Sequence, residues 1–251
     1  MSRTVIGIIS LAIAVVAIHL LYIGYIRPEA ALAIEAAKQA GQSAPRVLVV
    51  ILKDYEQEIC LILMLWGTFL ILGKCLEILK YRYLFNVDLL EGSAAGNGDL
   101  RTVLTTLEEL PGKVRRTPLV RVLMASLRRF IITNDVQNTS DAIESSVEAL
   151  AAENSMIRYL IWAIPSIGFI GTVRGIGEAL SQADQALAGD IAGMTDSLGV
   201  AFNSTLVALL ISILLMFLLH QLQRLQDGLI VDAQEYCETF LLNRISSVGQ
   251  D

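Results

Sequence analysis

Four long apolar runs constrain this chain more than any other feature, because a helix needs about twenty apolar residues to cross a bilayer. The second run is the shortest. Its uncharged part, 59–73, has 15 residues, and Lys74 can lengthen it by extending its side chain toward the interface. The sequence therefore predicts an all-α polytopic membrane protein with four spans, at about residues 4–26, 59–79, 159–180 and 197–219.

The composition excludes several other classes of protein. Hydrophobic residues make up 54% of the chain and charged residues 18%, whereas soluble domains carry about 25% charged residues. The net charge of -6 provides no basic surface for nucleic acid. Cys60, Cys75 and Cys237 lack CxxC spacing, so neither a zinc site nor a disulfide framework is predicted. HExxH, GxSxG and Walker A patterns are absent, and we expect no enzyme activity, metal or cofactor.

The spans divide the chain into four parts. Polar sequence rich in helix formers, with turns at Asn97-Gly98 and Pro111-Gly112, follows the second span. Helical apolar spacing from Asp141 to Arg158 predicts a long helix that continues into the third span. The predicted parts are two peripheral N-terminal spans with an outer loop at 27–58 (1–79), a cytoplasmic helical segment (80–157), a pore-lining helix pair (158–220) and a cytoplasmic C-terminal helix (221–251).

The orientation follows from the positions of lysine and arginine, which favour cytoplasmic loops. The segment from Lys80 to Arg129 carries nine of these residues, and the short loop 181–196 carries none. Both termini and the segment between the second and third spans are therefore expected in the cytoplasm.

Small and hydroxyl-bearing residues form a stripe on each of the last two spans at 100° per residue. Two interpretations remain open for the stripes. Small residues allow close helix packing, and hydroxyl groups can instead line a water-accessible wall that serves an ion or a carboxylate. The stripes comprise Gly168, Gly171, Thr172, Gly175 and Ala179 on the third span, and Ser197, Ala201, Ser204, Thr205, Ala208 and Ser212 on the fourth.

Two further features mark the third span. Pro165 removes one backbone hydrogen bond, which produces either a simple kink or a hinge. Arg174 and Glu178 are four residues apart and are expected to pair at the outer mouth.

The stripes also carry a resemblance to a known family. Pro165 to Ile176 resembles the proline-led, Gly-Thr-Val-containing helix of the TolQ and ExbB proteins. Ala201 to Leu206 resembles the final helix of MotA, in which an Ala-Phe pair precedes a threonine. The chain is thus similar to the MotA/TolQ/ExbB proton channel family. It departs at Arg174, where TolQ and ExbB usually have a large apolar or aromatic residue, and Thr205 matches MotA but not TolQ or ExbB.

The resemblance implies a stator subunit of a motor complex in the bacterial inner membrane. Members form pentamers around two copies of a single-span MotB/TolR/ExbD-like partner, and an acidic residue of that partner carries the proton or, alternatively, sodium. Thr172 and Thr205 are expected to face this residue, and the resemblance extends the ion pathway to Gly168, Gly171, Gly175, Ala201, Ser204 and Ala208.

A partner is also expected on physical grounds, because the centres of these spans contain no charged group that could carry a proton. The alternative is a secondary transporter, or a structural membrane protein with small-residue helix packing. Transporters of that class usually contain internal repeats, and no convincing repeat is found here.

Overall fold

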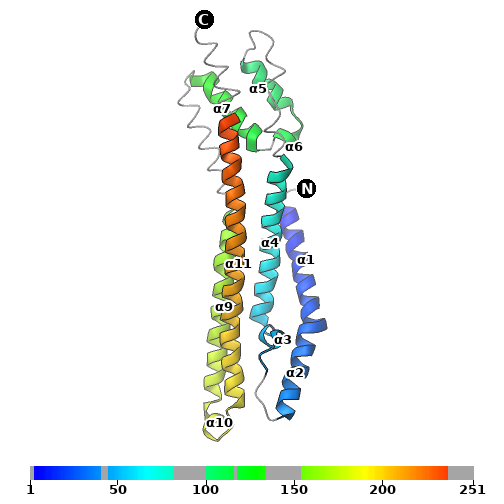
Figure 1. Ribbon diagram of the computed structural model, residues 1–251, viewed down its shortest axis with the longest axis vertical. Coiled ribbons are helices and arrows are strands. Elements are labelled where there is room, and N and C mark those ends of the chain that lie inside the picture. The colour runs from blue at the N-terminus through cyan, green and yellow to red at the C-terminus, as the bar shows by residue number, and fades with distance from the viewer. Residues whose placement is uncertain (1–2, 41–44, 82–99, 116–117, 134–153, 237–251) are drawn as a thin grey trace. The chain divides into compact units, whose positions relative to one another are not determined.

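The computed structural model describes residues 3–40, 45–81, 100–115, 118–133 and 154–236, and these residues form helices and short connections without a strand (Figure 1). The chain divides into two compact units. Unit 1 comprises Met1–Leu72 and Met156–Leu219, and unit 2 comprises Gly73–Ser155 and His220–Asp251. The predicted spans fall mainly in unit 1.

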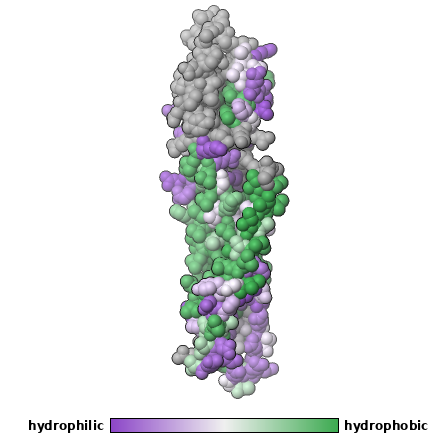
Figure 2. Space-filling model, turned by 90° about the vertical axis from the view of Figure 1, so that its right-hand side faces the viewer, coloured by the Kyte–Doolittle hydropathy of each residue, from purple (hydrophilic) through white to green (hydrophobic). Residues whose placement is uncertain are grey.

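Within the described residues, four helical stretches are long and apolar enough to cross a membrane, which confirms the predicted all-α polytopic membrane fold. Apolar side chains cover the middle of unit 1, and hydrophilic ones gather at the end where α2 and α10 lie (Figure 2). The four stretches are Val5–Gln39, Tyr55–Lys80, Ser155–Ser181 and Ala192–Leu229. They belong to α1 (Arg3–Leu21) with η1 (Tyr22–Ile26) and α2 (Arg27–Gln39), α4 (Tyr55–Tyr81), α9 (Ser155–Ser181) and α11 (Ala192–Tyr236).

The first of these helices extends beyond the end expected from the sequence. The predicted outer loop 27–58 begins with α2, and only the part after Gln39 contains non-helical connections, with α3 at Leu48–Ile51. The turn before Pro28 is widened: the N–H of Arg27 donates to the carbonyl of Tyr22, five residues back. A π-type turn there accommodates the proline ring, which in a regular helix presses on the carbonyl four residues before it.

In unit 1, α9 and α11 run antiparallel and are joined through α10 (Ala183–Leu187), and α4 packs on both of them. Gly67 of α4 brings the helices close together, because a Cβ at that position would lie 3.3 Å from Leu215 of α11 and 3.5 Å from Leu160 of α9. Ile164 and Ile71 are also buried in this core.

In unit 2, the described part of the predicted cytoplasmic segment contains α5 (Leu100–Glu109), α6 (Gly112–Arg115) and α7 (Pro118–Thr133). The turn predicted at Pro111-Gly112 separates α5 from α6. Helices α5 and α7 pack through buried Leu107, Val120, Leu123 and Leu127. The turn predicted at Asn97-Gly98 and the helix predicted from Asp141 to residue 153 lie outside the described residues.

Candidate functional site

The small residues of the two stripes lie in the contact between α9 and α11. A Cβ on Gly168 would be 2.5 Å from the Cβ of Ala208, and one on Gly171 would be 2.5 Å from the Cβ of Ser204. A Cβ on Gly175 would be 2.7 Å from the backbone nitrogen of Ala201. These distances leave no space for a side chain. The three glycines therefore allow the helix backbones to approach closely.

All six small residues assigned to the ion pathway are buried inside the chain. Ser204 and Ala208 are 1% and 0% exposed, and the hydroxyl of Ser204 donates to the carbonyl of Val200 at 2.8 Å. Helix packing accounts for these positions: Gly168, Gly171, Gly175, Ala201, Ser204 and Ala208.

The two threonines differ from these residues because they are half-buried, and the structure brings them together. Their hydroxyl groups hydrogen-bond to each other across the contact between α9 and α11. The Thr172 hydroxyl also reaches the carbonyl of Ala201 at 3.1 Å and that of Gly168 at 3.2 Å, and the Thr205 hydroxyl lies 3.3 Å from the carbonyl of Gly168. We call Thr172 and Thr205 the threonine pair.

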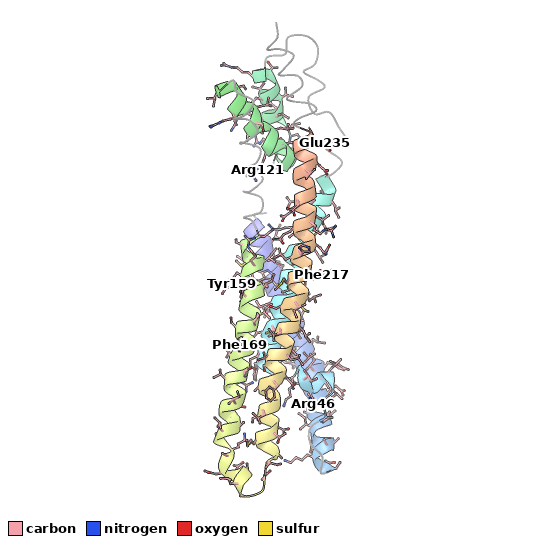
Figure 3. The ribbon with its side chains drawn as sticks, turned by 60° about the vertical axis from the view of Figure 1, so that its left-hand side comes forward. Arg46, Arg121, Tyr159, Phe169, Phe217 and Glu235 are labelled. Atoms are coloured by element: carbon pink, nitrogen blue, oxygen red, sulfur yellow. The ribbon has the colours of Figure 1, made fainter. Side chains whose placement is uncertain are left out.

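The threonine pair lies on the side of the α9–α11 contact away from α4. The α4 side is marked by Gly171, where a Cβ would lie 3.1 Å from the Cγ of Glu56, and by Ser204, which accepts from the Gln57 side chain at 3.4 Å. On the opposite side, the side chains nearest the threonines along each helix are apolar and exposed. They include Phe169 (Figure 3), Val173, Phe202 and Leu206. Among the described residues, no other helix covers this face of the contact.

Pro165 lies inside α9, where the helix continues without interruption. Because proline has no N–H, the carbonyl of Ile161 loses its usual donor four residues later. The hydroxyl of Ser212 on α11 supplies the missing hydrogen bond, donating to the Ile161 carbonyl at 2.7 Å. The buried carbonyl is therefore satisfied by a neighbouring helix, a common solution in membrane proteins.

We expect Ser212→Ala to destabilise the contact between α9 and α11 by about 1–3 kcal/mol, because the Ile161 carbonyl then has no donor. Adding Pro165→Ala should restore the thermal stability, since alanine at that position has an N–H that can donate to the Ile161 carbonyl. Melting curves of the purified protein in detergent test this. Ser166→Ala, which removes an exposed hydroxyl bonded to the Trp162 carbonyl, is the control. Equal melting temperatures for Ser212→Ala and this control would contradict the assignment.

The comparison with protein families agrees with this geometry. Residues 114–235 match the family model described as the MotA/TolQ/ExbB proton channel family, a stretch that includes α7, α9 and the threonine pair. Over these 122 of its 251 residues, the chain is similar to the MotA/TolQ/ExbB proton channel family. No curated protein and no solved structure matches the chain. The matching family is one of proton channels and not of enzymes, and a proton-channel role is the activity that this match supports.

Arg174, which departs from the TolQ and ExbB pattern, pairs with an acidic residue that the sequence analysis left unassigned. Its guanidinium binds both carboxylate oxygens of Glu56 on α4, with Nε–Oε1 at 2.7 Å and Nη2–Oε2 at 2.8 Å. The expected pair with Glu178 is also present, at 2.9 Å. Glu56 is 8% exposed, so the arginine compensates a carboxylate that the packing of α4 buries.

A second buried carboxylate connects α4 to the first span. Glu58 is 5% exposed; one of its oxygens lies 2.6 Å from His19 Nδ1, and the other accepts from Arg27 at 2.5 Å. The Arg27 guanidinium stacks on the Tyr55 ring at 4.4 Å. The only sequence signal for these contacts was the acidic run that begins α4, because the partners are 31 to 39 residues away.

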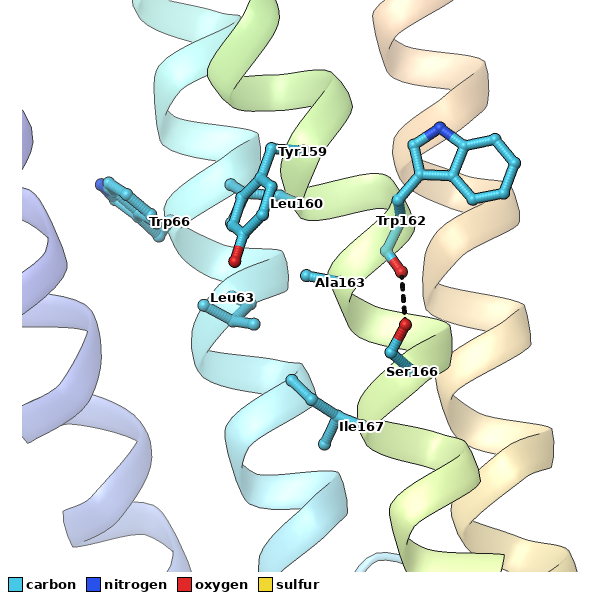
Figure 4. A pocket seen from close by; sticks show the side chains of 8 residues that line it. All are labelled: Leu63, Trp66, Tyr159, Leu160, Trp162, Ala163, Ser166 and Ile167. Carbon is cyan, nitrogen blue, oxygen red and sulfur yellow. Dashed lines mark hydrogen bonds between the residues drawn. The ribbon is translucent and has the colours of Figure 1, made fainter.

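An open groove of about 520 Å³ lies between α4 and α9 (Figure 4). Leu63 and Trp66 line it from α4, and Tyr159, Ala163 and Ile167 are among the lining residues of α9. At 100° per residue, Ala163 is on the opposite side of α9 from Thr172. The groove is therefore separate from the threonine pair, and its lining contains no acidic or basic side chain.

Proposed function

We propose that the chain is the multi-span subunit of a stator that converts proton flow into mechanical work. In this proposal five copies surround two copies of a single-span partner, whose acidic residue carries the proton past the threonine pair. The match of residues 114–235 to the proton channel family supports the proton-channel part of the proposal. The pentamer, the partner and the work are inferred from the resemblance stated above.

The observation that carries the proposal is the threonine pair on the face of α9 and α11 that α4 does not cover. A hydroxyl group has one donor and two acceptor sites. When Thr205 donates to Thr172 and Thr172 donates to Ala201, the Thr205 oxygen can still accept a hydrogen bond. It can then bind a protonated carboxylic acid, and by rotating its proton outward it can bind the carboxylate. The pair is therefore suited to both protonation states of an acidic side chain.

The chain requires another molecule to provide that acidic group. Neither α9 from Leu160 to Val173 nor α11 from Ser197 to Leu219 contains an acidic, basic or histidine residue. A proton carrier at this depth must titrate, and hydroxyl groups do not titrate near neutral pH. An acidic residue on a partner helix placed against Phe169 and Phe202 would meet the threonine pair directly.

The orientation of the subunit follows from its positive charges. We place both termini, and the segment that contains α5 and α7, in the cytoplasm, and the end at α10, whose loop 181–196 carries no lysine or arginine, outside, in the bacterial inner membrane. In this orientation Arg174 and Glu178 lie at the outer mouth. Helix packing alone explains the six buried small residues, but it does not require two hydroxyl groups at the uncovered edge. For this reason we prefer the channel to a purely structural membrane protein.

The test is reconstitution with the candidate partner, chosen as the protein with one apolar helix and an early aspartate that is encoded beside this chain. Particle images of the purified chain should have five-fold symmetry. Vesicles containing both proteins should acidify in response to an imposed gradient, as reported by a pH-sensitive dye, and replacing the partner aspartate by asparagine should stop the flux. A monomeric chain, or proton flux through the chain without the partner, would refute the proposal.

A further inference from the structure

The start of α4 contains buried oxygen atoms that the contacts described so far do not use. Among the described residues, the buried side-chain atoms without a hydrogen-bond partner are the Tyr22 hydroxyl, Oδ2 of Asp54 and Oε1 of Gln57. Asp54 and Gln57 belong to one turn, since the carbonyl of Asp54 accepts from the N–H of Glu58 at 3.2 Å. Native proteins rarely leave such groups unsatisfied, so each one requires an explanation.

Gln57 is held with its acceptor free. The residue is 0% exposed, and its amide nitrogen donates to the Ser204 hydroxyl. The carbonyl oxygen of the same side chain has no hydrogen-bond donor. Asp54 precedes it by three residues and stands immediately before α4, whose first turn contains Gln57. An ionised aspartate has only acceptors to offer. Two acceptors without a donor therefore belong to the first turn of α4.

The charged groups around Asp54 do not supply this donor. The Arg174 guanidinium is engaged by both oxygens of Glu56 and by Glu178. Lys53 lies on the same segment, and Tyr22 of η1 interacts electrostatically with Asp54 from the first span. Burial raises the pKa of the Asp54 carboxyl, and this effect exceeds the lowering by Lys53 and Arg174. Burial and the nearby carboxylates of Glu56 and Glu178 favour a proton on Asp54, whereas Lys53 and Arg174 oppose it less strongly.

We propose that Asp54 and Gln57 form a proton-binding site at the start of α4. In this site the protonated carboxyl of Asp54 donates to Oε1 of Gln57, whose amide nitrogen in turn donates to Ser204, the neighbour of Thr205. Binding one proton converts the carboxylate into a neutral acid and satisfies both orphaned oxygens. That the site delivers protons to the threonine pair rests on the proposed function, whereas proton binding by Asp54 does not.

A metal cation fits the site less well. Among the described residues, no group of three or more histidine, cysteine or acidic side chains is placed to hold a metal ion. Lys53 and Arg174, both close enough to affect Asp54 electrostatically, would repel a cation that requires the ionised carboxylate. A bound proton removes the negative charge and is compatible with both.

Infrared spectra of the full-length chain in vesicles, recorded against pH without any partner protein, test the proposal. We expect a carboxylic-acid C=O band that persists above the pH at which exposed aspartates ionise and that is absent from Asp54→Asn. Asp184→Asn, which changes an exposed aspartate of α10, should retain the band. Gln57→Met removes the acceptor and should lower the midpoint of the band by about one pH unit, a tenfold loss of proton affinity.

The outcomes separate this site from the stator proposal, because the measurement needs neither the partner nor ion-driven work. A band that survives in Asp54→Asn, or an unchanged midpoint in Gln57→Met, would show that Asp54 does not share a proton with Gln57. An Asp54 ionised throughout the neutral range would mean that water satisfies the two oxygens, and the proposal would be wrong. Carboxylate bands that respond to sodium at constant pH would reveal a metal site in its place.

Discussion

Replacing Thr172 and Thr205 together by valine should abolish proton-driven flux while leaving the assembled protein intact. Valine has nearly the shape of threonine, so the contact between α9 and α11 keeps its packing. The hydroxyl groups are lost, and with them the hydroxyl pair on the uncovered edge that can bond both a carboxylate and a carboxylic acid. The backbone carbonyls of Gly168 and Ala201 retain their helical N–H donors, so little stability should be lost.

Flux into vesicles that contain the chain and its partner measures this effect, and particle size measures assembly. Thr195→Val is the matched control, because Thr195 lies on α11 and donates to the carbonyl of Ile191 at 2.9 Å but is distant in sequence from the pair. It should keep full flux. The single variants should retain part of the flux, since one hydroxyl group remains in each. Normal flux in the double variant would exclude a role for the threonine pair.

The helical period was sufficient to place the small residues of each span on one face. It placed Gly168 and Gly175 on one face of the third span, and the structure packs that face against Ala208 and Ala201. The period did not distinguish the small residues buried between α9 and α11 from the threonine pair at the uncovered edge, because both sets lie within the same arc of each helix. That distinction depends on where α4 covers the contact, and α4 belongs to a distant part of the sequence.

The charged contacts of α4 could not be predicted in the same way. The apolar run was taken to begin at Ile59, so the acidic residues just before it were assigned to a loop in water. Glu56 and Glu58 are instead buried, and each pairs with an arginine. The partners, Arg174 and Arg27, are 118 and 31 residues away in the sequence. A local sequence pattern cannot predict ion pairs between residues this far apart in the chain. For Glu56, the available hint was Arg174, at a position where TolQ and ExbB usually have a large apolar or aromatic residue.

The second large effect concerns this arginine: Arg174→Met should destabilise the protein by about 2–4 kcal/mol. The change leaves the carboxylate of Glu56 buried and unpaired, and removing one partner of a fully buried pair costs about 3–5 kcal/mol. The estimate is lower here because the Arg174 side chain is 37% exposed, so solvent weakens part of the pair. Glu178 contributes little to the loss, since its own side chain is 46% exposed. A lower melting temperature in detergent measures the effect.

A double variant separates the cost of an unpaired charge from the loss of a useful bond. Glu56→Leu combined with Arg174→Met replaces the ion pair by apolar groups of similar size, and such replacements are often neutral or stabilising. We therefore expect the double variant to melt near the wild-type temperature, and Arg158→Met, which changes an exposed arginine of the same helix, to have no effect. If the double variant is as unstable as Arg174→Met, the pair itself holds α4 against α9. Recovery of the melting temperature would instead mean that the role of Arg174 is to compensate the buried charge of Glu56. Glu56 would then be the residue whose function must be explained.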